Sequence, residues 1–268
     1  MEAWLAHPAI QAGILPFVVA LVVAFLLART RWLALAQVAG FAVAVTLAAG
    51  WSFESLTSTR KLAIVGVATI AMCAAIEWKP AQWRRVALAV CIVLAASAVW
   101  MLWRLLAQKE VAPAVLAAVL AGGYVAMQSA LALQSGDDPV RSAASGAVLG
   151  MATGIVAILG ASAVLGTFAL AVGSAGAATL AVQFIRGRAS PVGRSISLPA
   201  AVVAALAGVN GVMTAELPWY ALLPLLLCVP ITRLAPSTLT ARVLCIAAFA
   251  LCLIPAAAAI ALAWFRPA

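Results

Sequence analysis

Long apolar blocks follow one another along the whole chain, and only short polar stretches separate them. A helix needs about 20 mainly apolar residues to cross the hydrocarbon core of a membrane. Because the blocks have this length, we expect an all-α, polytopic integral membrane helix bundle with about ten transmembrane helices. The expected spans are residues 10–28, 33–50, 62–76, 86–107, 113–133, 142–159, 165–185, 196–215, 218–233 and 243–265.

Two regions of this pattern need interpretation. The apolar stretch 142–185 is too long for one span, so we divide it between Gly160 and Gly166. The stretch 218–233 contains three prolines, and we interpret it as a kinked helix because membrane helices tolerate proline. About ten spans in 268 residues leave mostly short turns between them, so we expect no separate soluble domain. We therefore predict one transmembrane domain over residues 1–268.

Composition supports a membrane location. Hydrophobic residues make up 67% of the chain and charged residues only 9%, which is too little polar surface for a soluble domain. The formal net charge is +9, but the basic residues stand singly or in pairs between apolar blocks, as charges that flank spans do. With no basic stripe and only two tyrosines for base stacking, we expect the lipid bilayer as a partner and no nucleic acid.

Membrane orientation follows from the lysine and arginine bias. If both termini lie outside, the inner connections hold Arg29, Arg31, Lys79, Arg84, Arg85, Arg141, Arg186, Arg188, Arg194, Arg233 and Arg242. The outer segments then hold Arg60, Lys61, Arg104, Lys109 and Arg266. This asymmetry predicts that the N- and C-termini are outside. The frequent use of alanine, arginine and tryptophan favours a high-GC bacterium, and therefore the inner (cytoplasmic) membrane.

Small residues recur at intervals of four in two neighbouring spans. The first contains Gly146, Gly150 and Gly154, and the second contains Gly173 within a similar series. This interval places small residues on one helix face, where they allow two backbones to approach closely. We predict a tightly packed helix pair here, and a sliding or gating interface is the alternative interpretation.

The residues that usually carry out catalysis are nearly absent. His7 is the only histidine, the five cysteines lie inside apolar runs without a CxxC pair, and no Asp or Glu lies in the middle of a span. We therefore predict no catalytic site, no metal site and no cofactor. The pair Asp137–Asp138 is interpreted as a solvated turn that caps a helix.

Neutral polar side chains remain as candidates for a binding site inside the spans. Each must find a partner in hydrocarbon, so such residues either join helices or contact a solute. As substrate-binding residues we predict Gln128, Gln183, Asn210 and Thr214.

A second candidate site lies at the start of the span 62–76. Arg60 and Lys61 stand on the predicted outer side, against the general charge bias, and Ser58 or Thr59 could cap the helix that follows. Hydroxyl groups, amide donors and two cations together predict a site for an anion or a lipid headgroup.

Three classes of function fit these features. The first is a small secondary transporter or permease for a polar uncharged, zwitterionic or anionic small molecule. In length and number of spans the chain is similar to drug/metabolite exporters, although it has none of their motifs and the opposite predicted orientation. The alternatives are a non-catalytic subunit or assembly factor, which acts with a membrane-protein partner or as a homo-oligomer, and a lipid-handling membrane protein.

Overall fold

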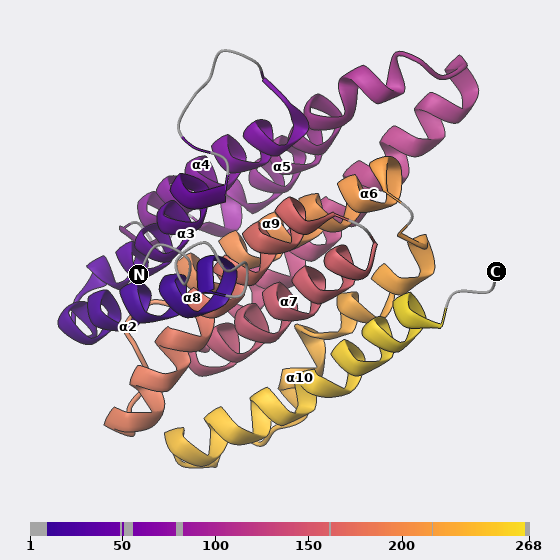
Figure 1. The fold of residues 1–268 in the computed structure, drawn as a ribbon. Coiled ribbons are helices and arrows are strands. Elements are labelled where there is room, and N and C mark those ends of the chain that lie inside the picture. Colours follow the sequence, from indigo (N-terminus) through magenta and orange to yellow (C-terminus); the bar gives the residue numbers. More distant parts are fainter. Residues whose placement is uncertain are drawn as a thin grey trace.

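The computed structural model describes residues 10–48, 50, 56–78, 83–160, 162–215 and 217–265, and every regular element among them is a helix (Figure 1). Eight of the described helices are long and apolar enough to cross a membrane. These findings confirm the prediction of an all-α, multi-pass membrane protein. His7 lies outside the described residues.

The eight long helices account for most of the expected spans. Two of them contain a non-α segment at their start, namely the π-helix η1 (Ile10–Ile14) before α2 (Leu15–Leu27) and the 3-10 helix η2 (Arg31–Leu33) before α3 (Ala34–Ala48). The other six are α5 (Trp83–Leu106), α6 (Val111–Ser135), α7 (Pro139–Leu159), α8 (Ala163–Arg186), α9 (Arg194–Thr214) and α10 (Ala241–Trp264). A further helix, α4 (Ser58–Trp78), occupies the expected span 62–76.

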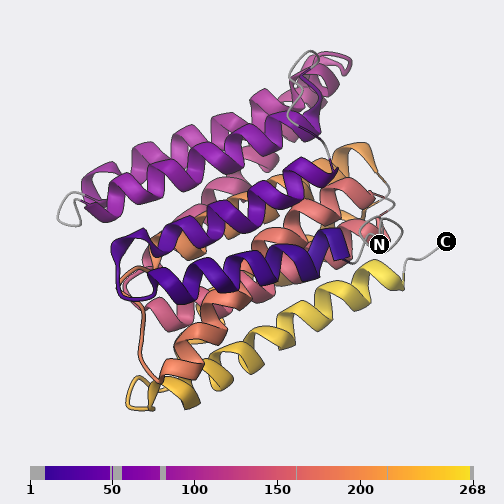
Figure 2. The ribbon, with the colours of Figure 1, turned by 60° about the vertical axis from the view of Figure 1, so that its left-hand side comes forward.

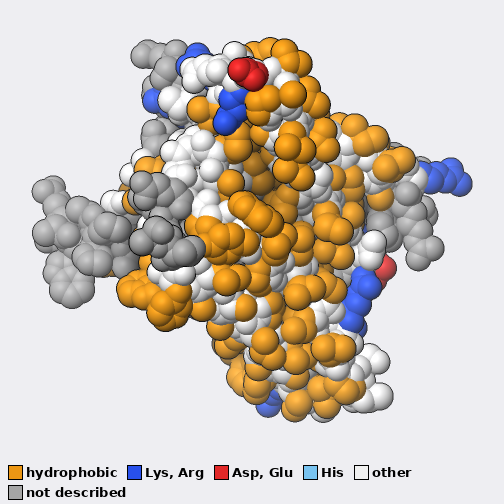
Figure 3. Space-filling view, turned by 90° about the vertical axis from the view of Figure 1, so that its right-hand side faces the viewer, with side chains coloured by type: hydrophobic (Ala, Val, Ile, Leu, Met, Phe, Trp, Pro, Cys, Tyr) orange, Lys and Arg blue, Asp and Glu red, His pale blue; other side chains and the backbone are white. Residues whose placement is uncertain are grey.

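Helix α9 forms the centre of the bundle. Every residue from Arg194 to Gly211 is buried, and α9 contacts each of the helices α3 to α8. The outer helices instead expose large apolar side chains, such as Val115 and Leu116 of α6. Figure 3 shows one face of the molecule covered with hydrophobic side chains, with lysine and arginine near its margins. Such a surface is suited to lipid rather than to water.

Helices α7 and α8 approach each other most closely at their glycines. A Cβ atom added to Gly150 would lie 2.6 Å from Cα of Gly173, and one added to Gly154 would lie 2.9 Å from the carbonyl oxygen of Gly166. Gly146 faces α9 instead, where an added Cβ would lie 3.3 Å from Cβ of Ala200. Glycine is required at Gly150 and Gly154 because a side chain there would meet the backbone of α8, whereas the contact at Gly146 is tight but less restrictive.

The expected α-helical span 218–233 is wrong in its helix type. The chain here forms three successive 3-10 helices, η4 (Trp219–Leu222), η5 (Pro224–Leu227) and η6 (Pro230–Leu234). Its hydrogen bonds connect residues three apart, as from Leu223 N to the Tyr220 carbonyl and from Leu226 N to the Leu223 carbonyl. Proline recurs every six residues and has no N–H donor, so a continuous α-helical ladder cannot form.

This 3-10 segment nevertheless runs beside the second half of α6. The carbonyl of Leu222 accepts from Tyr124, that of Leu225 accepts from Gln128, and Arg233 donates to Gln134 near the end of α6. At a rise of about 2.0 Å per residue, its 16 residues extend about 32 Å, close to the thickness of the hydrocarbon core. The segment therefore returns the chain across the bundle, and the start of α2 and the end of α10 lie at the same end (Figure 2).

Arginine side chains connect the helices at the other end of the bundle. Arg186 donates to the Phe25 carbonyl, and Arg242 donates to the Phe184 and Ile185 carbonyls. We call this the basic end, and its described arginines are Arg29, Arg31, Arg85, Arg141, Arg186, Arg188, Arg194, Arg233 and Arg242. The positive-inside rule predicts that the basic end faces the cytoplasm.

Candidate functional site

A cavity of about 690 Å³ opens at the basic end, between α2, the start of α3, α8 and the α8–α9 loop. We call it the arginine pocket. Its polar lining consists of Arg29, Arg186, Arg188, Thr179, Gln183 and Ser190. Leu33 and Val182 contribute apolar walls, and no described Asp or Glu lines it. A pocket of this size can hold a small organic molecule.

Local structure brings these side chains together. Helix α8 ends at Arg186 because Gly187 adopts a left-handed conformation with φ of 63°, and its N–H donates to the carbonyls of Gln183 and Phe184. The loop then returns along the helix, where the Ser190 hydroxyl donates to the Val192 carbonyl and accepts from Gln183 Nε2 at 3.2 Å. The turn thereby places Arg188 and Ser190 opposite the last turn of α8.

The electrostatics of the arginine pocket favour an anion. Arg186 Nη2 donates to the Phe25 carbonyl at 2.8 Å, and Arg29 and Arg188 are exposed without a hydrogen bond or ion pair to any described residue. The C-termini of α2 and α8 each contribute about half a negative charge. The three arginines outweigh them, which leaves a net charge of about +2.

Gln183 adds an acceptor to this positive site. Its side chain is only 2% exposed, and its Nε2 donates to the Pro139 carbonyl and to Ser190. Its Oε1 atom is buried and has no hydrogen-bond partner. Because an amide oxygen can only accept, a ligand that completes the site would carry a donor, such as a hydroxyl or an amine, beside its anionic group.

A second unpaired amide lies further along α3. Gln37, one turn beyond Leu33, is fully buried, and neither of its amide atoms has a hydrogen-bond partner. The next turn is closed by small residues, since a Cβ atom added to Gly40 would lie 3.0 Å from Cβ of Ala175 and 3.3 Å from Cβ of Ala20. We call Ala20, Gly40 and Ala175 the small-residue contact. It separates the arginine pocket, at the C-terminal ends of α2 and α8, from the N-terminal halves of these helices.

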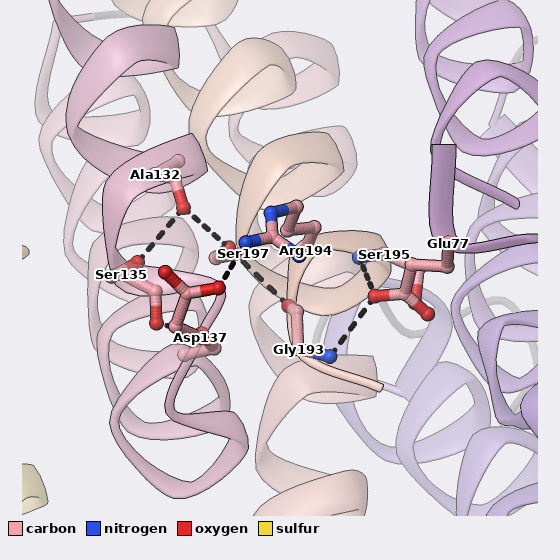
Figure 4. A network of polar contacts seen from close by, with 9 residues as sticks. Glu77, Ala132, Ser135, Asp137, Gly193, Arg194, Ser195 and Ser197 are labelled. Atoms are coloured by element: carbon pink, nitrogen blue, oxygen red, sulfur yellow. Dashed lines mark hydrogen bonds and ion pairs between the residues drawn. The ribbon is translucent and has the colours of Figure 1, made fainter. Parts of the chain in front are cut away.

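A separate polar network at the N-terminus of α9 holds the basic end together (Figure 4). Arg194 forms an ion pair with Asp137, and Glu77 Oε1 accepts from the N–H groups of Gly193 and Ser195, both at 3.0 Å. Burial raises the pKa of the Glu77 carboxyl, and the two N–H donors and the Arg194 charge oppose this shift. Glu77 therefore acts as an N-cap for α9 that is supplied by α4.

Replacing Glu77 with Ala is expected to lower the free energy of unfolding by about 1 kcal/mol, because two N–H groups at the start of α9 lose their acceptor. Glu77→Gln keeps an acceptor and lacks the charge, so it is expected to stay close to the wild type. Thermal unfolding of purified protein in detergent compares the two variants. Equal losses in both would show that the charge, and not the cap, matters.

The structure does not bring the predicted substrate-binding residues together. Gln183 lies in the last turns of α8 at the basic end, whereas Asn210 and Thr214 lie in the last turns of α9 at the opposite end. Thr214 donates to the Asn210 carbonyl, and Asn210 Oδ1 is buried without a hydrogen-bond partner. Gln128 donates to the Leu225 carbonyl and so joins α6 to the 3-10 segment.

The predicted anion site at Ser58, Thr59, Arg60 and Lys61 lies in the first turn of α4, and all but the buried Lys61 are half-buried. The cap is one residue earlier than expected, since Thr57 Oγ1 accepts from the Arg60 N–H. Lys61 Nζ donates to the Trp100 carbonyl at 2.8 Å and lies 4.9 Å from the centre of the Trp100 ring. Its ammonium group is thus held by α5.

Asp138 accepts from the N–H groups of Val140 and Arg141, which confirms the helix-capping turn predicted there. The three arginines of the pocket were interpreted from the sequence only as flanking charges. The one sequence signal for the pocket was that Gln183, Arg186 and Arg188 fall within six residues.

No protein-family model, curated protein or solved structure matches the chain.

Proposed function

We propose that this protein is a small secondary transporter, a permease, for a small organic anion or zwitterion that carries a hydroxyl or amine group. The arginine pocket is the observation that supports this function best. Three arginines supply positive charge, no described carboxylate opposes them, and the unpaired Gln183 Oε1 selects for a ligand with a hydrogen-bond donor.

Transport, rather than binding alone, is supported by the groups beyond the pocket. Unpaired amides in a membrane interior cost free energy, and Gln37 would gain partners if water or a solute reached it. Beyond Gln37 the helices α2, α3 and α8 meet at the small-residue contact of Ala20, Gly40 and Ala175. A small displacement of the α2–α3 hairpin relative to α8 would separate these residues without moving large side chains.

The experiment that tests this function measures flux in proteoliposomes. Glycerol 3-phosphate, glutamate and gluconate are suitable probes, because each combines an anionic group with hydroxyl or amine donors. The pocket variant is Arg186→Gln combined with Arg188→Gln. Arg85→Gln is the matched control, since Arg85 is an exposed arginine of the basic end that does not line the pocket.

We expect wild-type protein and the Arg85 variant to transport at least one probe. The double variant is expected to lose at least about tenfold in flux, which corresponds to about 1.4 kcal/mol of lost binding. All three proteins are first compared by size-exclusion chromatography, so that loss of fold is separated from loss of transport. Absence of flux for every probe, or equal flux in all three proteins, would contradict the proposal.

A further inference from the structure

A second cavity, of about 920 Å³, lies between α5 and α6 on another side of the bundle. Its apolar walls include Leu88 and Cys91 of α5 and Met127 and Leu133 of α6. Leu88 is 71% exposed and Met127 is 55% exposed, so the cavity is a lateral groove that opens toward the surrounding lipid. We call it the α5–α6 groove.

The length of the α5–α6 groove matches one leaflet of a bilayer. Its lining extends along α6 from Ala126 to Gln134 and ends at Asp137, in the turn that follows α6 at the basic end. At 1.5 Å per residue the helical part of this distance is about 12 Å, to which the turn adds, and half of a hydrocarbon core is about 15 Å. A lipid with its headgroup at the basic end would therefore place its acyl chains along the apolar walls.

The polar end of the groove carries one cation and one anion. Arg233 is exposed, and its Nη2 atom donates to Gln134 Oε1 at 3.2 Å. Asp137 binds Arg194 through Oδ1, but 64% of its side chain is exposed. Among the described residues no ion pair joins Arg233 to Asp137, and the exposed part of the Asp137 carboxylate remains accessible to a ligand beside its ion pair with Arg194.

We propose that the α5–α6 groove binds one zwitterionic phospholipid with an ethanolamine headgroup. The phosphate lies beside the Arg233 guanidinium, and the primary ammonium donates to the Asp137 carboxylate. A choline headgroup has no N–H to donate, and a glycerol headgroup has no cation for Asp137. This lipid site is separate from the arginine pocket and does not depend on the proposed transport function.

Photo-crosslinking in nanodiscs tests the site with the full-length protein. Phosphatidylethanolamine, phosphatidylcholine and phosphatidylglycerol, each with a diazirine in one acyl chain, are incorporated separately into discs of phosphatidylcholine. Mass spectrometry then measures crosslinks to peptides that contain Cys91 or Met127. The variants are Arg233→Gln at the polar end, Met127→Trp in the groove, and Arg31→Gln as a control arginine of the basic end outside the groove.

We expect crosslinking by the ethanolamine lipid to exceed that by the other two about fivefold, the factor expected for one exposed charge contact. Arg233→Gln should remove this preference, Met127→Trp should lower crosslinking by all three lipids, and Arg31→Gln should match the wild type. Equal crosslinking by the three lipids would show only ordinary surrounding lipid and would overturn the proposal. A preference for the glycerol headgroup would overturn it as well.

Discussion

Replacing Gly150 with Val is expected to prevent α7 and α8 from packing and to remove most of the folded protein. A Cβ atom at this position would lie 2.6 Å from Cα of Gly173, and the atom it meets belongs to the backbone. A flexible side chain could rotate away, but a helix backbone in the middle of the bundle cannot. Overpacking in protein interiors costs about 1–3 kcal/mol, and we expect this substitution to reach or exceed the upper value.

Gly123→Val is the matched control for Gly150→Val. Gly123 also lies inside a membrane-length helix, α6, but nothing lies within 4 Å of a Cβ atom added there. Both substitutions add the same side chain and the same helix propensity, so only the tertiary contact differs. Size-exclusion chromatography of detergent extracts should show a monodisperse peak for the control and little of it for Gly150→Val. Similar peaks for both variants would mean that α7 and α8 do not approach as closely as described.

Replacing Gln128 with Leu is expected to destabilise the protein by about 1 kcal/mol. Gln128 is fully buried, and its Nε2 atom donates to the Leu225 carbonyl at 3.1 Å. Within the 3-10 segment that carbonyl also accepts from the Cys228 N–H at 3.2 Å, so Gln128 adds a second donor from a neighbouring helix. Leucine has a similar size and no donor, so the substitution removes the bond that joins α6 to the 3-10 segment and leaves the Leu225 carbonyl with the Cys228 N–H alone.

Thermal unfolding measured with a thiol-reactive fluorophore suits this prediction, because four of the five cysteines are buried and react only as the bundle opens. Ser129→Ala is the control. The Ser129 hydroxyl is also buried and donates to the Val125 carbonyl within its own helix, where its loss should change little. If Gln128→Leu unfolds like the wild type but loses flux, Gln128 serves a solute rather than the 3-10 segment.

The helices were predictable because the membrane restricts what a local sequence can do. In hydrocarbon, each backbone N–H and carbonyl must be paired, and an apolar stretch of about 20 residues achieves this most simply as a helix. Gly146, Gly150 and Gly154 could also be recognised as an interface, since an interval of four defines a face without reference to the partner. The pattern does not reveal that Gly150 meets α8 whereas Gly146 meets α9.

The 3-10 segment marks the limit of prediction from local pattern. Its prolines were visible, and kinking was the expected consequence. The sequence could not show that Tyr124 and Gln128, almost 100 residues earlier, would donate to the Leu222 and Leu225 carbonyls. These donors from α6 add to the bonds within the 3-10 segment and hold it against the bundle, and this contact depends on tertiary packing.

The candidate sites depended on packing still more. Arg29 and Arg188 are each ordinary flanking charges in the sequence, and they form a pocket only because α2 and α8 end at the same level. Lys61 was predicted to be available to an anion, but α5 passes close enough for the Trp100 carbonyl and ring to hold its ammonium group. Neither outcome can be read from residues that are local in the chain.

The sequence by itself determined that this protein is an all-α, multi-pass membrane protein, which segments cross the bundle, and which connections carry the positive charge. These properties follow from hydropathy and charge within single segments. The tertiary structure alone decided which helix each glycine of α7 meets, the helix type of the 3-10 crossing, the arginine pocket and the α5–α6 groove. Each of these requires side chains from helices far apart in sequence, and their meeting depends on how whole helices pack.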